Sequence, residues 1–273
     1  MAPNKKDATD SVSGIIGTRG SGQDSGEAPL ASGRGRGRMV NYTLCVTPGS
    51  AKVPTQIRLA ARWTVPPETL FGIFTHPKNA RIYRDTKAVT DWRVLSAGPP
   101  GLKVVSIEKL EEVEVLGVKR SLSTLLKVTE DCRDADRPSV VFTMERSEAH
   151  KRFEGGWTWD AVRDPATGAV IGCEGLLLQD VLPKGVPRLV QKMPGFKHVL
   201  RCTSGRAARR MIEDTNVAVA ALVTLRAERG LSLAQALDTL CSGGQYPGAA
   251  VGSHQIAGSS SVSASESDEE NVV

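Results

Sequence analysis

Four histidines, His76, His150, His198 and His254, are the side chains best suited to metal binding or to proton transfer near neutral pH. They form no HxH, HExxH or HxxxH pattern. The sequence also lacks a GxSxG elbow, a catalytic Cys/His signature and a GxxxxGKS/T loop. The spacing of its reactive residues therefore predicts no metal site, no cofactor and no catalytic residues of these kinds.

An acid inside a strand is the remaining candidate for chemistry. Glu154 is the best placed, because Phe153 and two glycines flank it in an alternating segment. A carboxyl group facing a closed interior would have a raised pKa and could act as a general acid. The simpler interpretation is a solvated residue on the outer face of a one-sided sheet, and we favour it.

The most distinctive stretch runs from residue 181 to residue 212 and contains no acid. Apolar residues interleave with basic ones, as in segments that bury apolar groups in a lipid interface while Lys and Arg contact phosphates. We expect an anionic-surface contact from six basic residues: Lys184, Arg188, Lys192, Lys197, Arg201 and Arg206. The alternative is a solvated loop followed by an Arg-rich first helical turn.

The composition places the protein in a broad class. The chain has 273 residues, 40% of them hydrophobic, and a net charge of +5, which is ordinary for a globular protein. Its five cysteines are an odd number without a CxxC pair, which predicts reduced thiols in an intracellular protein. We expect a cytoplasmic location, with an organelle or a peripheral membrane as alternatives. No apolar run is long enough for a membrane span.

Three regions differ in composition. Residues 1–52 are rich in Gly, Ser and Asp and include an Arg-Gly run at residues 33–38, so we predict a disordered tail. Residues 53–241 carry hydrophobic periodicity and form the predicted domain. Residues 242–273 are rich in Ser, contain acids but no Lys or Arg, and form a second predicted disordered tail.

Periodicity within residues 53–241 predicts an α+β fold. Ile57–Val65 alternates as a strand, and two short helices follow, over residues 66–77 and 78–84. About six antiparallel strands come next, with bulges expected in Lys103–Leu116 and at Gly155–Gly156. A long helix is predicted from Gly205 to Gly230, and a short one at Ser232–Leu240. We expect the sheet to curl around the long helix.

This order of elements resembles the START-like helix-grip superfamily, which includes polyketide cyclase-like and coenzyme Q-binding proteins. Three segments carry the resemblance: Phe74–Asn79, Phe153–Trp157 and Met211–Asp214. The last two look like a plant and algal branch of START-like proteins. His76 departs from the acid usual in relatives. The resemblance implies an elongated apolar cavity between sheet and long helix.

Alternation within each strand suggests which residues face that cavity. We expect it to be lined by Val105, Ile107, Leu122, Phe142, Met144, Trp157, Leu176, Leu178 and Met211. The competing interpretation is that they fill a solid core. Because the chain has few aromatic residues, an aliphatic cavity that suits acyl or prenyl chains is expected.

These observations favour a non-enzymatic protein that binds or transfers a hydrophobic, lipid-like ligand and contacts an anionic membrane through a basic rim. One alternative is a nucleic-acid or ribonucleoprotein-associated module, suggested by the Arg-Gly run and a pI near 9.0. A cavity enzyme of the polyketide cyclase type is the third interpretation. Fold resemblance alone does not choose among them.

Overall fold

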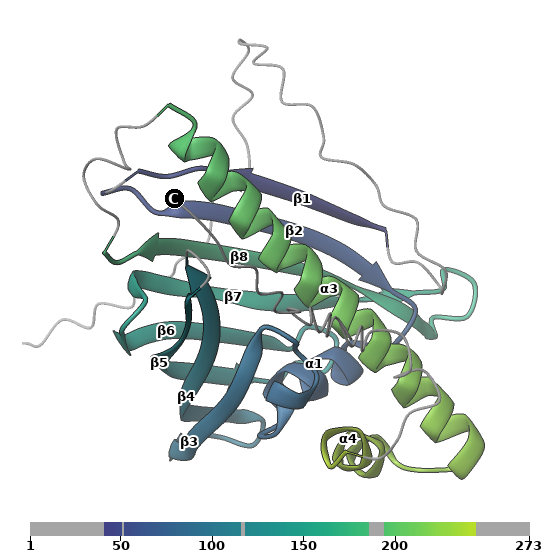
Figure 1. The fold of residues 1–273 in the computed structure, drawn as a ribbon. Coiled ribbons are helices and arrows are strands. Elements are labelled where there is room, and N and C mark those ends of the chain that lie inside the picture. Colours follow the sequence, from purple (N-terminus) through teal and green to yellow (C-terminus); the bar gives the residue numbers. More distant parts are fainter. Residues whose placement is uncertain (1–40, 51, 116–117, 186–193, 244–273) are drawn as a thin grey trace, which may run out of the picture.

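The protein folds around one curved antiparallel sheet (Figure 1). The structure is a computed structural model that describes residues 41–50, 52–115, 118–185 and 194–243. Eight strands in the described part pair in the order β1-β2-β8-β7-β6-β5-β4-β3. Their bounds are β1 Tyr42–Thr47, β2 Thr55–Trp63, β3 Thr86–Ala97, β4 Leu102–Val115, β5 Val118–Asp131, β6 Ser139–Ser147, β7 His150–Arg163 and β8 Val170–Pro183.

Helices lie on one side of this sheet, the concave side (Figure 1). They are α1 (Pro67–Thr75), the 3-10 helix η1 (Asn79–Arg81), α3 (Phe196–Arg229) and α4 (Leu233–Cys241). Pro67 begins α1 because its fixed φ suits the first helical turn. Gly230 ends α3 with φ 63°, and Ser232 caps α4 through a capping box with Gln235.

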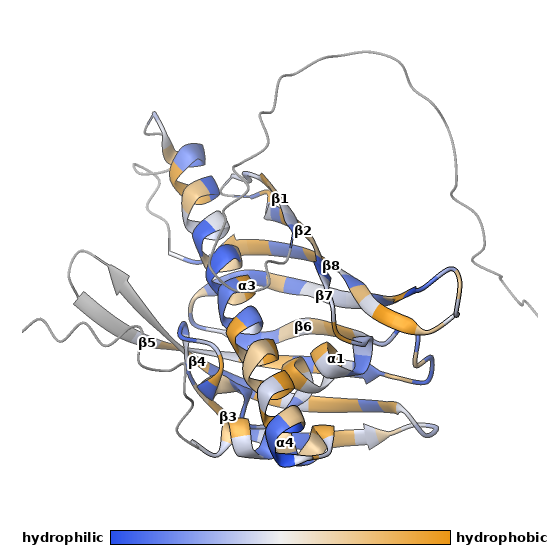
Figure 2. Cartoon of the chain, turned by 90° about the vertical axis from the view of Figure 1, so that its right-hand side faces the viewer, coloured by the Kyte–Doolittle hydropathy of each residue, from blue (hydrophilic) through white to orange (hydrophobic). Residues whose placement is uncertain are grey.

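The core follows from the two periodicities of the sequence, and Figure 2 shows apolar residues alternating along the strands and clustering on α1. Every second residue of β2 is buried, which leaves Leu59 and Trp63 facing the helices. On α3 the buried stripe repeats at helical spacing through Ala208, Ile212 and Thr215. Sheet and helix therefore share one core. The fold is the helix-grip α+β architecture that the sequence predicts.

Two boundaries differ from the sequence-based expectation. Strand β1 lies inside residues 1–52, which were predicted to be a disordered tail; the six-residue alternation of Tyr42–Thr47 was too short to stand out. Helix α3 begins at Phe196 rather than Gly205. It can extend because residues 196–204 contain no proline or glycine, whereas Gly195 at its N-terminus takes a φ of 90°.

The expected bulges also lie elsewhere. Strands β4 and β5 pair without a register shift, whereas β3 and β4 pair irregularly at three places. Asp91, with φ 52°, sits at one of them. Further shifts occur between β5 and β6 and near both ends of the β7–β8 pair. Gly155 and Gly156 pair regularly with β6 and β8. A Cβ on Gly155 would lie 2.3 Å from the Leu178 carbonyl oxygen, so close strand approach explains the glycine.

Several predicted features fall outside the described residues. These are the Arg-Gly run at 33–38, the Ser-rich acidic segment from residue 244 on, Arg188 and Lys192. In the part of the chain that is described, no helix combines the length and apolar character needed to cross a membrane.

Candidate functional site: the concave face of the sheet

The concave face is built from rows of side chains that cross the sheet. In antiparallel strands, directly paired residues point to the same face. Pairing therefore aligns Ile57 of β2, Phe142 of β6, and Val128 and Val105 of β5 and β4 along one row, with Val46 of β1 at its end. A neighbouring row holds Leu59, Leu177, Trp157 and Val140. These rows form the wall opposite α3.

Helix α3 covers only one end of this wall. Gly205 of α3 lies over Leu44 and Val46 of β1, and a Cβ added to it would be 3.9 Å from each. The Trp63 indole Nε1 donates to Asn216 Oδ1 at 3.0 Å and fixes the middle of the helix over β2. Besides these strands α3 packs against α1 and α4 (Figure 1). The inner face of β4–β6 lies further from the helix.

Apolar side chains on that less covered part face inward but keep some solvent exposure. Ile107, Phe142, Met144 and Phe153 pack against the core yet are only partly buried. The rings of Phe142 and Phe153 lie 5.4 Å apart and form a continuous aromatic surface. Met211 of α3 is partly buried in the same way. This uneven burial separates an accessible apolar surface from the solid core.

The residues predicted to line a cavity divide into a buried group, a partly exposed inward group and, described below, an outward group. Val105 and Trp157 are almost fully buried, at 1% and 3% exposure, and belong to the solid core. Ile107, Leu122, Phe142, Met144 and Met211 lie on the inner side and are partly exposed.

Leu176 and Leu178 point the other way and correct the expectation. Leu178 is 50% exposed on the outer face, since β8 pairs Leu177 with the inward Leu59 and Trp157. The run Leu176–Leu178 is apolar at every position, so its alternation could be assigned in either phase.

A small polar group lies where β6 turns into β7. The hydroxyls of Thr124 and Ser147 are both buried and lie 2.8 Å apart, and the Ser147 hydroxyl is 3.5 Å from His150 Nδ1. Lys184 Nζ donates to the Ser147 carbonyl at 2.5 Å. The His150 ring also lies 5.1 Å from that of Phe153. One end of the accessible apolar surface is therefore polar.

A buried acid that sequence reasoning missed faces the same interior. The Glu130 side chain is 3% exposed, and its Oε2 lies 2.8 Å from Lys103 Nζ. Burial raises the pKa of Glu130, and the bond to Lys103 opposes that shift. The ammonium of Lys103 also lies 5.5 Å from the ring centre of Trp92. The sequence did contain a signal for this acid, because Glu130 continues the alternation in which Leu126 and Val128 point inward.

Glu154, the best acid by sequence, lies on the opposite face. It pairs with Asp180 and Thr143 in outward rows, and Arg152 Nε donates to its Oε1 at 2.8 Å. Arg152 also lies 3.2 Å from Asp180. Outward placement and a cationic partner make Glu154 a surface ion-pair residue, the interpretation that the sequence favoured.

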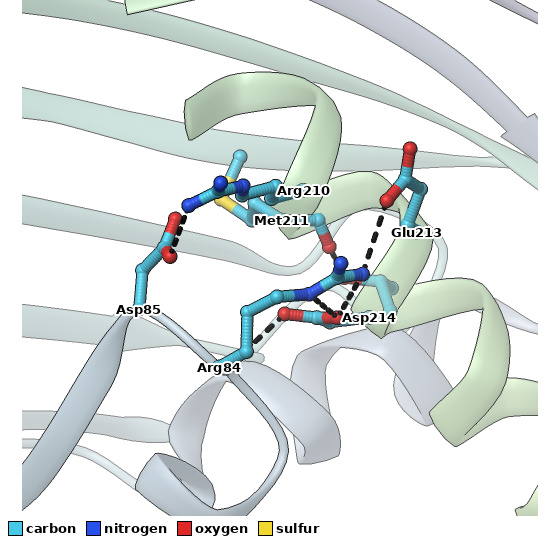
Figure 3. Close-up of polar contacts among 7 residues, drawn as sticks. Arg84, Asp85, Arg210, Met211, Glu213 and Asp214 are labelled. Carbon is cyan, nitrogen blue, oxygen red and sulfur yellow. Dashed lines mark hydrogen bonds and ion pairs between the residues drawn. The ribbon is translucent and has the colours of Figure 1, made fainter. Parts of the chain in front are cut away.

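A polar latch joins α3 to the segment that leads into β3 (Figure 3). We call Arg84, Asp85, Arg210, Glu213 and Asp214 the latch. The Arg84 side chain donates to Asp214 at 2.7 Å and to Glu213 at 3.0 Å, and the Arg84 backbone N–H donates to Asp214 at 3.0 Å. In a second ion pair the helix supplies the cation instead, and Arg210 of α3 donates to Asp85 at 2.9 Å. These contacts raise the pKa of Arg84, chiefly through the bond to Asp214.

The basic residues of the acid-free stretch take different positions. Lys184, Lys197 and Arg206 are exposed. Arg201 is partly buried, and Arg210 belongs to the latch. Val199, which is 55% exposed, lies between Lys197 and Arg201 on the first turns of α3. The end of β1, the start of β2 and the end of β8 pair beside one another, so these turns and Lys184 share one end of the sheet (Figure 1).

The chain thus has a START-like helix-grip fold with an accessible apolar inner face. No family model matches this sequence, and no curated protein is similar to it in sequence.

Similar solved structures include the Zhui aromatase/cyclase from Streptomyces sp. R1128, at 14% identity over 64% of this chain and 96% of that one, with a TM-score of 0.40. A START superfamily protein from Mycobacterium smegmatis has 11% identity over 59% and 94%, with a TM-score of 0.41. Human StAR-related lipid transfer protein 5 has 12% identity over 68% and 83%, with a TM-score of 0.41. Likenesses of this size do not define a family for the chain.

Proposed function

We propose that this protein binds or transfers a hydrophobic, lipid-like ligand without catalysing a reaction. The observation that carries the proposal is the uneven burial of the concave face. Phe142, Phe153 and Met144 face inward beside a solid core and remain partly exposed. An apolar chain laid along them would remove this surface from water, at about 25 cal/mol per Å². From the sequence motifs we further propose that the chain belongs to the plant and algal branch of START-like proteins.

The acids of the sheet support a binding protein over an enzyme. Glu130 faces the interior, but Lys103 holds it in an ion pair. Glu154 lies outside and is bonded to Arg152. The buried hydroxyls of Thr124 and Ser147 are bonded to each other. The two carboxylates are therefore charge-paired and the two hydroxyls hydrogen-bonded, as structural polar groups commonly are.

We further propose that the exposed basic residues at one end of the sheet form a membrane-facing rim. Lys184, Lys197 and Arg206 together with Val199 combine cationic and apolar exposure. A basic residue near an anionic bilayer contributes about 1 kcal/mol, which salt weakens. Docking at this end would bring the bilayer next to the accessible apolar surface.

Native mass spectrometry of the purified full chain, followed by lipid extraction, tests the proposed ligand. We expect a bound species in the mass range of lipids that leaves with organic solvent. Finding only the apo mass after purification, together with no uptake of palmitate or phospholipid when these are supplied, would refute ligand binding.

Vesicle sedimentation tests the rim separately. The full chain should bind vesicles made of phosphatidylcholine with about 30% phosphatidylserine, an anionic lipid. It should dissociate from them at high salt, which screens the charges. Lys197→Glu with Arg206→Glu should abolish this binding. The matched control is Arg58→Glu with Lys127→Glu, two exposed basic residues on the outward sides of β2 and β5. Equal loss in both double variants would show a general charge effect and contradict the rim.

A further inference from the structure

Arg201 occupies an inward position on α3, unlike its basic neighbours. The buried stripe of the helix runs through Gly205, Ala208 and Ile212. Arg201 lies four residues before Gly205 and therefore on the same stripe, one turn toward the N-terminus. Burial agrees, since Arg201 is partly buried while Lys197 and Cys202 are exposed.

The Arg201 guanidinium lacks the partners that the other inward or bridging charges have. Its Nε is buried and has no hydrogen-bond partner, and no ion pair of Arg201 is present among the described residues. Arg84 and Arg210 are held by latch acids, and Lys103 is held by Glu130. A buried donor left without an acceptor is unfavourable, because it gives up its hydrogen bond to water and gains none in the protein.

Arg201 lies at the same end of the sheet as Phe153 of the accessible apolar surface. Gly205 lies over Val46, near the end of β1, so Arg201 lies beyond it toward the end of the sheet where β2 begins. There Thr55 pairs with Val181, and Val181 pairs with Phe153, one of the partly exposed inward residues. The chain between residues 181 and 212 supplies no acid to neutralise the guanidinium.

We infer that Arg201 binds the anionic head group of an amphipathic ligand whose apolar chain lies along Phe153 and Phe142. This inference rests on the proposed function and names its ligand class. The planar guanidinium presents donors in a fork that matches a carboxylate or a phosphate monoester, so either head group would satisfy it. A neutral head group would leave the buried Nε donor without an ionic acceptor.

Titration of the purified, delipidated full chain with four probes tests this. They are palmitate, 1-palmitoyl lysophosphatidic acid, hexadecanol and inorganic phosphate. The wild type should bind at least one of the two acidic lipids about tenfold or more tightly than hexadecanol, the size expected for a charge-assisted bond. Comparing palmitate with lysophosphatidic acid distinguishes the carboxylate from the phosphate. Inorganic phosphate should bind weakly, because it lacks the apolar chain.

Arg201→Gln should remove the preference for acidic lipids and leave hexadecanol binding unchanged. The matched control Arg209→Gln removes an exposed charge of α3 that belongs to neither the rim nor the latch, and it should keep the preference. A second measurement excludes a merely structural role: thermal unfolding of Arg201→Gln should occur at the wild-type temperature or above, since the change removes a partly buried cation that has no ion-pair partner among the described residues.

The outcomes separate the inference from the function beneath it. Hexadecanol and acidic lipids bound equally by the wild type, or an acid preference that survives Arg201→Gln, would overturn the inference and leave ligand binding intact. Loss of preference in both glutamine variants would assign it to general surface charge and also overturn the inference. Failure of every lipid probe to bind would overturn both.

Discussion

Met211 shows how single side chains separate a binding surface from a core. It is inward and partly buried, so enlarging it should fill accessible space without overpacking buried neighbours. We expect Met211→Trp to reduce palmitate uptake at least about tenfold, as loss of the apolar contact of several methylene groups would, with little change in stability. The control Leu178→Trp enlarges an outward residue, and equal loss of uptake in both variants would contradict this surface as the site.

Glu130 should make stability depend on pH in a direction opposite to that of an ordinary surface acid. Burial raises its pKa in the folded chain above the unfolded value, so the folded state holds the proton more strongly. This contribution is fully present below the unfolded pKa and is lost as pH rises through the folded pKa. Glu130→Gln should remove that loss, so its stability relative to wild type should improve as pH rises from acid to neutral.

Urea unfolding of both proteins at several pH values measures the effect of Glu130. Asp131 provides a contrast, because bonding to Arg133 lowers its pKa to about 2, which favours the folded state above the unfolded pKa. Asp131→Asn should therefore lose stability relative to wild type as pH rises from acid to neutral. Parallel curves for wild type and Glu130→Gln would show that Lys103 cancels the effect of burial.

At the scale of elements, replacing glycine by alanine should change stability in opposite directions at Gly155 and Gly205. A methyl on Gly155 would meet the backbone of β8, with Leu178 O at 2.3 Å and Gln179 Cα at 2.8 Å. Gly155→Ala should therefore destabilise the protein by about 1–3 kcal/mol. Gly205 lies within α3 and has its nearest neighbours at 3.8–3.9 Å, so Gly205→Ala should stabilise it by about 0.5–1 kcal/mol. Denaturant titration compares the two, and the same sign for both would contradict these packing distances.

The elements that the sequence predicts well are those with strong local signals. The alternating segment Ile57–Val65 overlaps β2, and Gly230 ends α3 because a left-handed cap favours glycine. Strand β1 escaped prediction because its six residues are held in place by pairing with β2, which is not a local property. The site was harder to predict for the same reason. Leu178 and Arg201 have their orientation set by strand register and by where α3 begins.

At the scale of the whole molecule, the latch connects α3 to the far edge of the sheet. Helix α3 rests on β1 and β2, while Arg84 and Asp85 lead directly into β3 at the other edge (Figure 1). Asp214 is only 10% exposed at the side chain, so removing the Arg84 side chain would leave a nearly buried carboxylate with a backbone N–H donor but no cation. The latch therefore helps to keep the curved sheet closed against the helix.

Arg84→Ala should destabilise the protein by about 1–3 kcal/mol and increase hydrogen exchange in β3 more than in β2 or β8. Arg210→Gln is the matched comparison, because the Arg210–Asp85 pair is exposed on both sides and should contribute at most about 1 kcal/mol. Uniform exchange across all strands in Arg84→Ala would indicate a global loss of stability and would contradict a local closing role.

The placement of the tryptophans gives the protein an optical property. Trp63, Trp157 and Trp159 are buried together, with the rings of Trp157 and Trp159 stacked at 5.7 Å and those of Trp63 and Trp157 6.1 Å apart, and Trp92 packs against the same core. Light absorbed near 280 nm by the three buried tryptophans is thus collected within one chromophore cluster. A conjugated polyene fatty acid entering along Phe142 would lie within energy-transfer range of that cluster. Its arrival and departure could then be followed by quenching of indole emission, without a label on the protein.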